Sequence, residues 1–440
     1  MTLLNSFRTH LASFRFPAGR ALVAVSGGPD SVVLLDLLVR TRDTHRLELV
    51  VAHLDHGIHP DSARVAERVQ SLAVSYGLPF EGGRLALGPE AGETLARARR
   101  YAWLEGLRER MGAELILTAH HADDQIETVL MRVLAGSGPA GLAGMEPQHG
   151  RLVRPLLPFR RADLACYLEE AGLAAWLDPA NSDLRHLRSW IRTELLPVLS
   201  RRLPEVQSNL QRLAAQAARD RAAWNAVLDV LPDLDLAVEN EGISVAASVL
   251  EDYDSPLKLA VVLALARRIG CPLGPARAAR VVTLLGSGNS GARVPLGTSW
   301  TAELAFGRLR IHAGRPEGTA TPWSMNGPRG EGVWGRWQFR WERATTPAHQ
   351  ERVGLSAWFT LDPLTVRGWL PGERLKPLGG AGRRLVVRCF QEERVPRSRR
   401  GSWPVLAQRG DLIWIPGVCR SDLRLPSAGT EALRVDAEYA

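Results

Sequence analysis

A glycine-rich turn joins an apolar run to a helical pattern near the start of the chain. The turn reads Ser26-Gly27-Gly28-Pro29-Asp30-Ser31, follows an expected buried strand at Ala21–Val25 and opens an expected helix at Ser31–Arg40. Two glycines let the backbone bend sharply and approach a ligand, and a helix start offers N–H groups and a dipole that attract anions. The turn therefore predicts a strand, a phosphate loop and a helix, although any such junction could use a glycine turn with a helix cap.

The same turn excludes one large class of nucleotide sites. It lacks the G-x-x-x-x-G-K-[ST] spacing of kinase-type and GTPase-type loops, and it contains no lysine that could reach a γ-phosphate. We therefore expect this loop to hold pyrophosphate while the chemistry takes place at the α-phosphate.

Strand-like and helix-like segments alternate through the first 200 residues. The further expected strands are Leu47–Leu54, Pro79–Leu85 and Glu114–Ala119, and the further expected helices are Ser62–Tyr76, Thr94–Arg110 and Ala122–Ala135. Repeated strand–helix units predict an α/β fold with a doubly wound parallel sheet. Ligands of such sheets bind beyond the carboxyl ends of the strands, which is where the glycine-rich turn lies.

The length of 440 residues exceeds one simple core and predicts two or three domains. We expect a catalytic domain over residues 1–200, a helical connector and middle domain over 201–345, and a small basic α+β domain over 346–440. Arg202–Leu231 has the pattern of a long amphipathic helix, and Arg315–Gly330 has the Pro and Gly content of a linker.

Composition narrows the class of protein. The chain has no run of about 18 apolar residues and no apolar signal core at its start, so we expect a cytoplasmic protein. Its four cysteines form no C-x-x-C pair, which argues against a zinc site or a cysteine-ligated cluster. Residues 351–440 contribute +5 of the net charge of +8, which suggests a polyanionic partner, with a solvated basic face as the alternative.

Polar clusters follow two of the expected strands. His53 ends the second strand, where contact with a nucleotide is favoured over metal ligation. A second cluster follows Glu114–Ala119 and consists of His120, His121, Asp123, Asp124 and Glu127. Either aspartate could cap the following helix. Two carboxylates beside two imidazoles exceed what a cap requires, which favours a role in binding Mg²⁺ or a cationic amine.

Two carboxylates of the first helix are further candidates. Asp30 lies in the phosphate loop and is the better candidate for Mg²⁺ near the phosphates. Asp36 lies among apolar residues, where it either pairs with Arg40 one turn later on an exposed face or acts as a metal or substrate ligand.

Arg97 and Arg100 share one face of an expected helix and suit phosphate or transition-state charge, with a solvated arginine stripe as the alternative. The glycines of Gly136–Met145 predict a mobile loop that closes over substrate, or else a plain linker.

Longer segments carry a family resemblance. SGGPDS at 26–31, HLDHGIHPDS at 53–62, ETLARARRY at 93–101 and TAHHADDQIETVLMRVLAGSGPAGLAGM at 118–145 resemble the tRNA(Ile)-lysidine synthetases of the PP-loop ATP pyrophosphatase superfamily. The match continues with RPLL at 154–157, DPANSD at 178–183 and HLRSWIR at 186–192, where Ser189 replaces the usual asparagine. VRGWLPGER at 366–374 and VPRSRR at 395–400 resemble the terminal domain of that family.

The resemblance implies a PP-loop, Rossmann-like catalytic domain and a two-step reaction on an isoleucine tRNA with a CAU anticodon. ATP would adenylate the C2 carbonyl oxygen of the wobble cytidine and release pyrophosphate. The side-chain amine of L-lysine would then displace AMP to form lysidine, which changes the codon read from AUG to AUA. A homodimer is compatible with the resemblance.

The resemblance and the motifs together assign roles to numbered residues. The expected nucleotide-binding residues are Ser26, Gly27, Gly28, Pro29, Asp30, Ser31 and His53. The expected catalytic residues are Asp30, Asp36, Arg97, Arg100, Asp123 and Asp124. The expected contacts to lysine or tRNA are His120, His121, Asp124, Glu127, Arg192, Arg397, Arg399 and Arg400. We expect Asp30 and Asp123 to bind Mg²⁺, and Trp369 and Trp403 either to stack on bases or to pack in a core.

Three other functions fit part of the sequence. A PP-loop tRNA thiolase would usually need paired or reactive cysteines, which are missing here. A PP-loop ligase that forms amides on small molecules has no use for a basic C-terminal domain. A non-catalytic RNA-binding protein has no use for an intact loop at 26–31.

Overall fold

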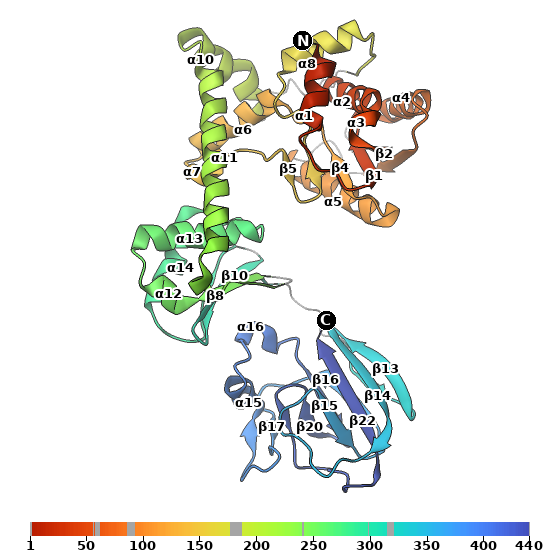
Figure 1. Ribbon diagram of the computed structural model, residues 1–440, viewed down its shortest axis with the longest axis vertical. Coiled ribbons are helices and arrows are strands. Elements are labelled where there is room, and N and C mark those ends of the chain that lie inside the picture. Colours follow the sequence, from red (N-terminus) through yellow and green to blue (C-terminus); the bar gives the residue numbers. More distant parts are fainter. Residues whose placement is uncertain are drawn as a thin grey trace. The chain divides into compact units, whose positions relative to one another are not determined.

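The computed structural model describes most of the chain, and its elements are shown in Figure 1. The described residues are 2–55, 57, 62–85, 93–176, 187–239, 242–297, 299–314 and 321–439. They form two compact units, Met1–Ala223 and Trp224–Ala440. No helix of the described ranges is long and apolar enough to cross a membrane.

The first unit is built on one sheet with the strand order β3-β2-β1-β4-β6-β5. The strands are β1 Gly19–Ala24, β2 Leu47–Asp55, β3 Phe80–Arg84, β4 Leu115–Leu117, β5 Gln148–His149 and β6 Leu152–Val153. All neighbouring pairs are parallel except β5 with β6. The predicted doubly wound parallel sheet is confirmed.

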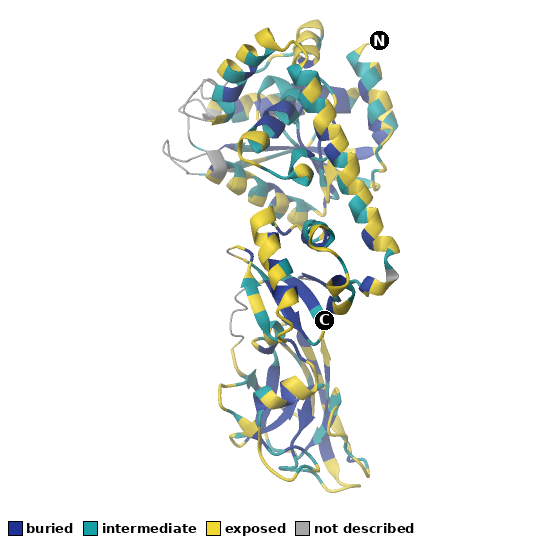
Figure 2. Cartoon of the chain, turned by 90° about the vertical axis from the view of Figure 1, so that its left-hand side faces the viewer, coloured by how far each residue is buried: buried dark blue, intermediate teal, exposed yellow. Residues whose placement is uncertain are grey.

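Helices cover both faces of this sheet because successive residues of each strand point to opposite sides. Val23 and Val51 pack in one core with α1 (Leu3–Leu11), α2 (Pro29–Arg40), α4 (Ser62–Ser75) and α8 (Arg161–Glu170). Leu22 and Val50 pack in another core with α5 (Glu93–Met111). Figure 2 shows the buried strands inside and the exposed outer faces of the helices.

The strand order reverses between β1 and β4, which lie side by side. The chain leaves β1 into α2 and leaves β4 into α6 (Ala122–Leu134), so both helices begin at the same edge of the sheet. Such an edge is the usual ligand site of open parallel sheets. The remaining helices of this unit are α3 Arg42–His45, α7 Pro139–Leu142, α9 Leu187–Trp190, a π-helical turn Ile191–Leu195, α10 Leu196–Arg202 and α11 Val206–Val230.

The second unit contains antiparallel sheets. One sheet has the order β7-β8-β11-β10-β9 and shares a core with helices. Its strands are β7 Ala237–Glu239, β8 Gly242–Ala246, β9 Ala292–Pro295, β10 Trp300–Ala305 and β11 Arg308–Ala313, and its helices are α12 Ala247–Glu251, α13 Ser255–Arg268 and α14 Pro275–Gly286. The middle region therefore carries a sheet as well as the helices that we predicted.

Two further antiparallel sheets follow, with the orders β12-β16-β19-β20-β21 and β13-β14-β22-β15. Their strands are β12 Trp323–Met325, β13 Arg329–Trp334, β14 Trp337–Thr345, β15 Ser356–Phe359, β16 Leu364–Gly368, β19 Pro404–Gln408, β20 Asp411–Ile415, β21 Cys419–Arg420 and β22 Glu431–Tyr439. A small pair joins β17 Arg374–Leu375 to β18 Arg384–Leu385, beside α15 Val386–Glu392 and α16 Arg397–Arg400.

The pairing of these strands begins the C-terminal sheets earlier in the chain than the domain boundary that we expected. β14 pairs with β22 from Trp337↔Tyr439 to Thr345↔Glu431. Residues 323–345 therefore belong to the C-terminal sheets, earlier than the boundary that we expected between 345 and 346. Within the predicted linker Arg315–Gly330, residues 321–330 contribute β12 and the start of β13, and 315–320 lie outside the described residues.

Candidate active site

The phosphate loop has a backbone that depends on glycine. Gly27 has a φ of +87°, and a Cβ there would lie 2.6 Å from Val65 Cγ1. Gly28 is the N-cap of α2, and Pro29 occupies its first turn, where a missing N–H costs nothing. The Ser31 hydroxyl donates to the Gly28 carbonyl at 2.8 Å. The loop is thus held by its own groups with the start of α2 directed toward the sheet edge.

Two neighbours complete the loop. The Trp176 N–H donates to the Gly27 carbonyl at 2.9 Å. His53 Nδ1 lies 2.8 Å from the Val25 carbonyl oxygen, which can only accept, so Nδ1 carries the proton and Nε2 is an acceptor. Burial lowers the pKa of His53 and keeps the ring neutral. The imidazole therefore lies directly beside the strand end that precedes the loop.

His121, and not an aspartate, caps helix α6. Its Nδ1 accepts from the N–H groups of Asp123 and Asp124 at 3.2 and 3.4 Å. The Asp124 carboxylate accepts in return from the His121 N–H at 3.0 Å. The alternative that Asp123 or Asp124 caps the helix holds in part, because His121 is the N-cap and the Asp124 carboxylate completes the capping box.

The capping histidine also links the starts of α2 and α6. His121 Nε2 lies 3.5 Å from Asp30 Oδ2 and 3.5 Å from Asp124 Oδ2. Burial lowers the pKa of His121, but the hydrogen bond to Asp30 and the surrounding carboxylates outweigh it and raise the pKa. Burial raises the pKa of Asp30, but His121, Arg161 and Arg192 outweigh it and lower the pKa.

Asp124 and Glu127 hold two arginines from the segment after residue 186. Arg188 donates to Asp124 at 2.7 Å and to Glu127 at 2.6 Å. Arg192 donates to both oxygens of Glu127. Glu127 is only 1% exposed. Burial raises its pKa, but the two arginines outweigh burial and lower the pKa, so this carboxylate is ionised.

His120 lies among cations. Its Nδ1 is 3.0 Å from the Thr118 hydroxyl. Burial lowers the pKa of His120 well below its usual value, with further lowering from nearby arginines that include Arg97 and Arg100. Both predicted α5 arginines therefore lie near the polar cluster, and Arg97 is 5.4 Å above the ring of Tyr101. A neutral imidazole ringed by guanidinium groups suits contact with an anionic or electron-rich ligand.

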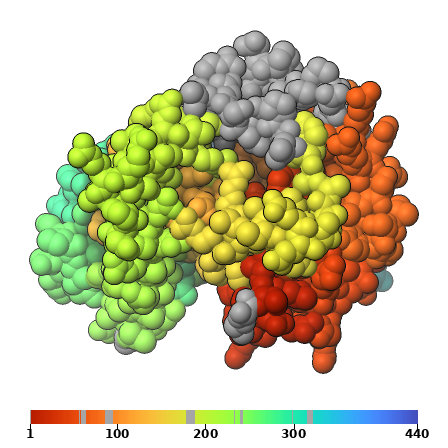
Figure 3. All heavy atoms as spheres, turned by 90° about the horizontal axis from the view of Figure 1, so that it is seen from above, coloured from red at the N-terminus to blue at the C-terminus, as the bar shows by residue number. Residues whose placement is uncertain are grey.

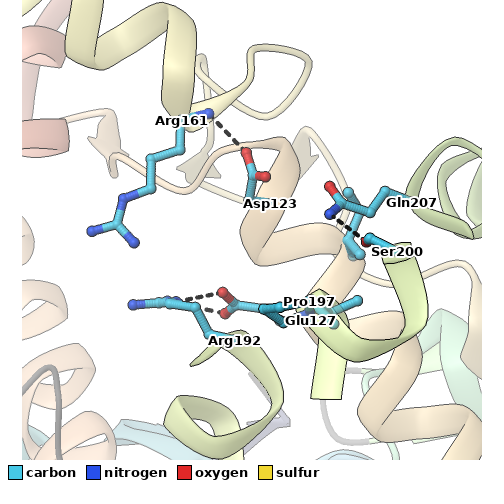
Figure 4. Close-up of a pocket in the computed structure, with 9 residues that line it drawn as sticks. Asp123, Glu127, Arg161, Arg192, Pro197, Ser200 and Gln207 are labelled. Atoms are coloured by element: carbon cyan, nitrogen blue, oxygen red, sulfur yellow. Dashed lines mark hydrogen bonds and ion pairs between the residues drawn. The ribbon is translucent and has the colours of Figure 1, made fainter. Parts of the chain in front are cut away.

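A pocket of about 350 Å³ opens beside these residues. Figure 3 shows the hollow from above, between α11 in green and α8 in yellow. The lining includes acids from α6, arginines from two elements, and amide and hydroxyl groups from α10 and α11 (Figure 4). Its polar lining residues are Asp123, Glu127, Arg161, Arg192, Ser200 and Gln207.

Asp36 belongs to the core of the fold and not to this site. It is 1% exposed, and its carboxylate accepts from the hydroxyls of Tyr76 and Tyr167 at 2.6 and 2.5 Å. Arg40 also donates to it, at 2.8 Å. The predicted ligand role is wrong, because three donors from α2, α8 and the end of α4 already satisfy both oxygens. The predicted pair with Arg40 exists, but on a buried carboxylate.

The glycine-rich segment 136–145 is held to α6. The Gln125 side chain donates to the carbonyls of Ala143 and Met145 at 3.1 Å and accepts from the Met145 N–H at 2.7 Å. Arg132 donates to the carbonyls of Gly141 and Gly144. These contacts fix the end of the segment to α6, and the mobility that we predicted for residues 136–145 stays a prediction.

The two carboxylates that we expected to bind Mg²⁺, Asp30 and Asp123, differ in their surroundings. In the described ranges, no group of three or more His, Cys, Asp or Glu side chains could hold a metal ion. Both Asp123 oxygens are occupied, by Arg160 Nη2 and by the Arg161 N–H, each at 2.7 Å. Asp30 is 28% exposed and adjoins the phosphate loop. Asp123 is similarly exposed, at 26%, but arginine donors occupy its oxygens, so Asp30 is the better placed of the two to hold a cation.

The C-terminal arginines differ from one another. Arg397 is exposed, whereas Arg400 is buried and donates from Nε and Nη2 to the Val395 carbonyl. Arg399 lies 6.0 Å from the ring of Tyr439. The expected RNA contact at Arg400 is therefore wrong, since its guanidinium is used inside the domain.

The two tryptophans are engaged in the same domain. Trp369 Nε1 donates to the Arg400 carbonyl, and Trp403 Nε1 donates to the Pro416 carbonyl. Both rings pack against Phe390. Packing in a core, the second of our two expectations, fits these contacts better than stacking on bases.

Sequence reasoning missed five residues of the pocket region, namely Arg160, Arg161, Arg188, Ser200 and Gln207. A signal existed for Arg188, because Arg188 and Arg192 are four residues apart on a helical segment and Asp124 and Glu127 are three apart on another. Such pairs can meet face to face. No spacing in the sequence indicates that the other four approach α6.

The fold and the site define a PP-loop ATP-binding protein. The family model for the PP-loop domain matches residues 3–199 of the sequence, and the family model for the TilS substrate C-terminal domain matches residues 364–437. A tRNA(Ile)-lysidine synthase of Geobacter sulfurreducens is 34% identical over 98% of this chain and 95% of that protein. Those of Symbiobacterium thermophilum and Alkalilimnicola ehrlichii are 32% and 35% identical, over 99% and 91% of this chain and 98% and 89% of theirs. The chain belongs to the tRNA(Ile)-lysidine synthase family.

Proposed function

We propose that this protein uses ATP to ligate L-lysine to C2 of the wobble cytidine in a CAU-anticodon isoleucine tRNA. For a chain that belongs to this family, one structural observation supports the proposal most directly. The phosphate loop, the His121 cap and the Asp124–Glu127 carboxylates converge at the edge where β1 and β4 end. The alternatives of a thiolase and of a non-catalytic RNA-binding protein are not favoured.

In the first step, the cytidine C2 oxygen attacks the α-phosphorus of ATP and pyrophosphate leaves. Loop residues 26–31 would hold the departing phosphates through the N–H groups at the start of α2. Arg161 and Arg192 lie close enough to Asp30 to lower its pKa, so they would add positive charge near the same phosphates. His53 would accept a hydrogen bond from the nucleotide through Nε2.

Mg²⁺ would neutralise charge on the phosphates when bound. Asp30 is the side chain that would hold it, because magnesium sites of this kind use one or two carboxylates together with substrate phosphates. Asp123 is better understood as a residue that fixes the start of α8.

In the second step, the lysine side-chain nitrogen bonds to C2, the bond from C2 to the adenylate oxygen breaks, AMP leaves and the attacking nitrogen loses protons. The pocket of about 350 Å³ beside α6 supports a zwitterionic substrate, because its lining carries both acids and arginines. Glu127 and Asp124 would attract the ammonium group, and Arg161 would attract a carboxylate.

The tRNA would also contact the C-terminal domain. Arg397 and Arg399 are the expected phosphate contacts that keep an accessible position. We expect the reaction to take place in the cytoplasm, where ATP, lysine and tRNA occur together. A homodimer is compatible with this function, and light scattering after gel filtration would measure it.

The experiment that tests the function follows both products. Purified protein is incubated with ATP, Mg²⁺, labelled lysine and an unmodified transcript of the CAU-anticodon isoleucine tRNA. We expect tRNA-dependent release of pyrophosphate and AMP with label entering the tRNA, and no labelling of a methionine tRNA with the same anticodon. Absence of both products with the isoleucine transcript contradicts the proposal.

A further inference from the structure

Helix α11 contacts the pocket through one amide side chain in its first turn. Gln207 Oε1 accepts a hydrogen bond from Arg160 Nη2, and Gln207 Nε2 donates to the Ser200 hydroxyl at 3.2 Å. Arg160 Nη2 also donates to Asp123 Oδ1 at 2.7 Å. A continuous polar chain therefore runs from α10 through α11 to the start of α6. Figure 4 shows Gln207, Ser200 and Asp123 around the pocket.

The chain ends on the helix start that carries the reactive cluster. Asp123 occupies the first turn of α6, between the cap His121 and the carboxylate Asp124. Its second oxygen accepts from the Arg161 N–H. Asp123 thus joins three elements, α6, α8 and, through Arg160, α11. A change at Gln207 would reach the acids and the arginine that line the pocket.

Polar contacts are not needed merely to attach α10 and α11 here. Leu199 and Leu210 pack against the apolar cluster that contains Ile126 and Leu130. That packing supplies the attachment, and it is non-directional. Hydrogen bonds to a charged group are directional and fix distances within tenths of an ångström. The polar chain therefore serves to set position.

We infer that Gln207 is a positioning residue that, through Arg160 and Asp123, sets the width of the pocket in which lysine is bound. The inference rests on the proposed function for the identity of the ligand. Gln207 lies in α11, after the residues 3–199 that match the PP-loop domain. The pocket thus has one wall from outside that domain, and Gln207 joins this wall to Arg160 and Asp123.

The first test uses three variants at one position or on one helix. Gln207→Met keeps the length of the side chain and removes both hydrogen bonds, whereas Gln207→Glu keeps an acceptor for Arg160. Gln216→Met is the matched control, since the Gln216 side chain contacts only Asp220 and Arg219 among its described hydrogen-bond partners. Steady-state lysine incorporation is measured with lysine varied and then with ATP varied, alongside the midpoint of urea unfolding.

We expect Gln207→Met to raise the KM for lysine by up to about tenfold, the limit reached if the whole free energy of the hydrogen bond to Arg160 is transmitted to lysine binding. The kcat and the KM for ATP should stay near wild type, whereas the unfolding midpoint should fall modestly because two hydrogen bonds are lost. Gln207→Glu should restore the KM for lysine to within about threefold of wild type. An unchanged KM for lysine in Gln207→Met, or an equal rise in Gln216→Met, overturns the inference.

A double-mutant cycle tests whether Gln207 acts through Arg160. If both lie on one chain, Arg160→Met and the double variant should each raise the KM for lysine to about the same extent as Gln207→Met. If the fold-rise in the KM for lysine of the double variant equals the product of the fold-rises of the two single variants, the two residues act independently and the inference is overturned. The proposed function fails separately, since in that case wild-type protein incorporates no lysine at all.

Discussion

Arg192 binds Glu127 through two charge-assisted hydrogen bonds, from Nε to Oε1 at 2.6 Å and from Nη2 to Oε2 at 3.0 Å. Arg188 donates to the same carboxylate at 2.6 Å. Two cations therefore face a carboxylate that is almost fully buried, and Asp124 supplies the second negative charge. The cluster is balanced, so an added ammonium group would require an arginine to change partner. This balance gives Glu127 both a structural and a functional role.

Replacing this carboxylate should affect stability and activity together. We expect Glu127→Gln to lower the free energy of unfolding by about 1–3 kcal/mol, because two arginines lose a charged acceptor. Lysine incorporation should fall at least about tenfold in kcat/KM. Glu105→Gln, which alters an exposed pair with Arg108 on α5, is the control and should change stability by less than about 1 kcal/mol. Urea unfolding and the labelling assay measure both quantities, and equal effects in the two variants would contradict this role.

The contribution of Glu127 should depend on pH in one direction. The folded-state pKa is lowered from 4.5, so its ionised form is favoured by folding. The stabilisation is therefore fully present above about pH 4.5 and is lost as the pH falls through the folded-state pKa. The difference in unfolding free energy between wild type and Glu127→Gln should shrink between pH 7 and pH 3.5. A difference that grows on acidification would refute the assignment.

Gly27 should tolerate no side chain. Gly27→Ala combines a φ of +87° with a Cβ placed 2.6 Å from Val65 Cγ1. We expect weaker ATP binding and a loss of more than about 1–2 kcal/mol in unfolding free energy. Gly77→Ala is the control, because φ there is +63° but a Cβ would meet no atom within 4 Å. In that variant the free energy of unfolding should fall only by the cost of the positive φ, about 1 kcal/mol. Its ATP binding, measured by filter assay or calorimetry, should equal that of wild type.

Substitutions at the two aspartates of α2 should have different effects on activity and stability. Asp30→Asn should abolish most tRNA-dependent pyrophosphate release and leave the unfolding midpoint close to that of wild type. Asp36→Asn should do the reverse, since it weakens hydrogen bonds from Tyr76, Tyr167 and Arg40 in the core. We expect a loss of roughly 2 kcal/mol in stability and near-normal turnover of the folded fraction. Unchanged pyrophosphate release in Asp30→Asn would remove it from the nucleotide site.

The C-terminal arginines should also behave differently. Arg397→Glu should weaken tRNA binding and reduce the slope of log K against log salt by about 0.7–0.9 for each phosphate that the protein no longer neutralises. Arg400→Met should leave that slope unchanged and lower stability, because it removes two hydrogen bonds to the Val395 carbonyl. Titration of labelled tRNA at several salt concentrations distinguishes the two. An unaltered slope in Arg397→Glu would place the phosphate-binding residues elsewhere.

Local patterns predicted the elements well because each pattern has a local cause. The alternation of apolar strands with helices indicated the parallel sheet, and the turn Ser26–Ser31 indicated where β1 gives way to α2. The long helix expected at Arg202–Leu231 corresponds to α11, Val206–Val230, whereas Arg202 is the last residue of α10.

Contacts between residues far apart in the sequence were harder to predict. Asp36 was assigned to chemistry because a carboxylate in an apolar helix is unusual, yet its partners Tyr76 and Tyr167 lie 40 and 131 residues away. Likewise, Arg400 belongs to a basic run in the sequence but turns inward to Val395. One-dimensional charge counts cannot tell an exposed cation from a buried one.

The sequence by itself determined the phosphate loop, the parallel sheet and the membership of the polar cluster, since these depend on backbone freedom, periodicity and residue type within short segments. Only the tertiary structure decided that His121 caps α6, that Arg188 and Arg192 neutralise Asp124 and Glu127, and that Gln207 reaches the pocket through Arg160. Apart from the His121 cap, which is local, those contacts join elements separated by tens of residues. Their geometry depends on how helices pack around the sheet, which no local pattern encodes.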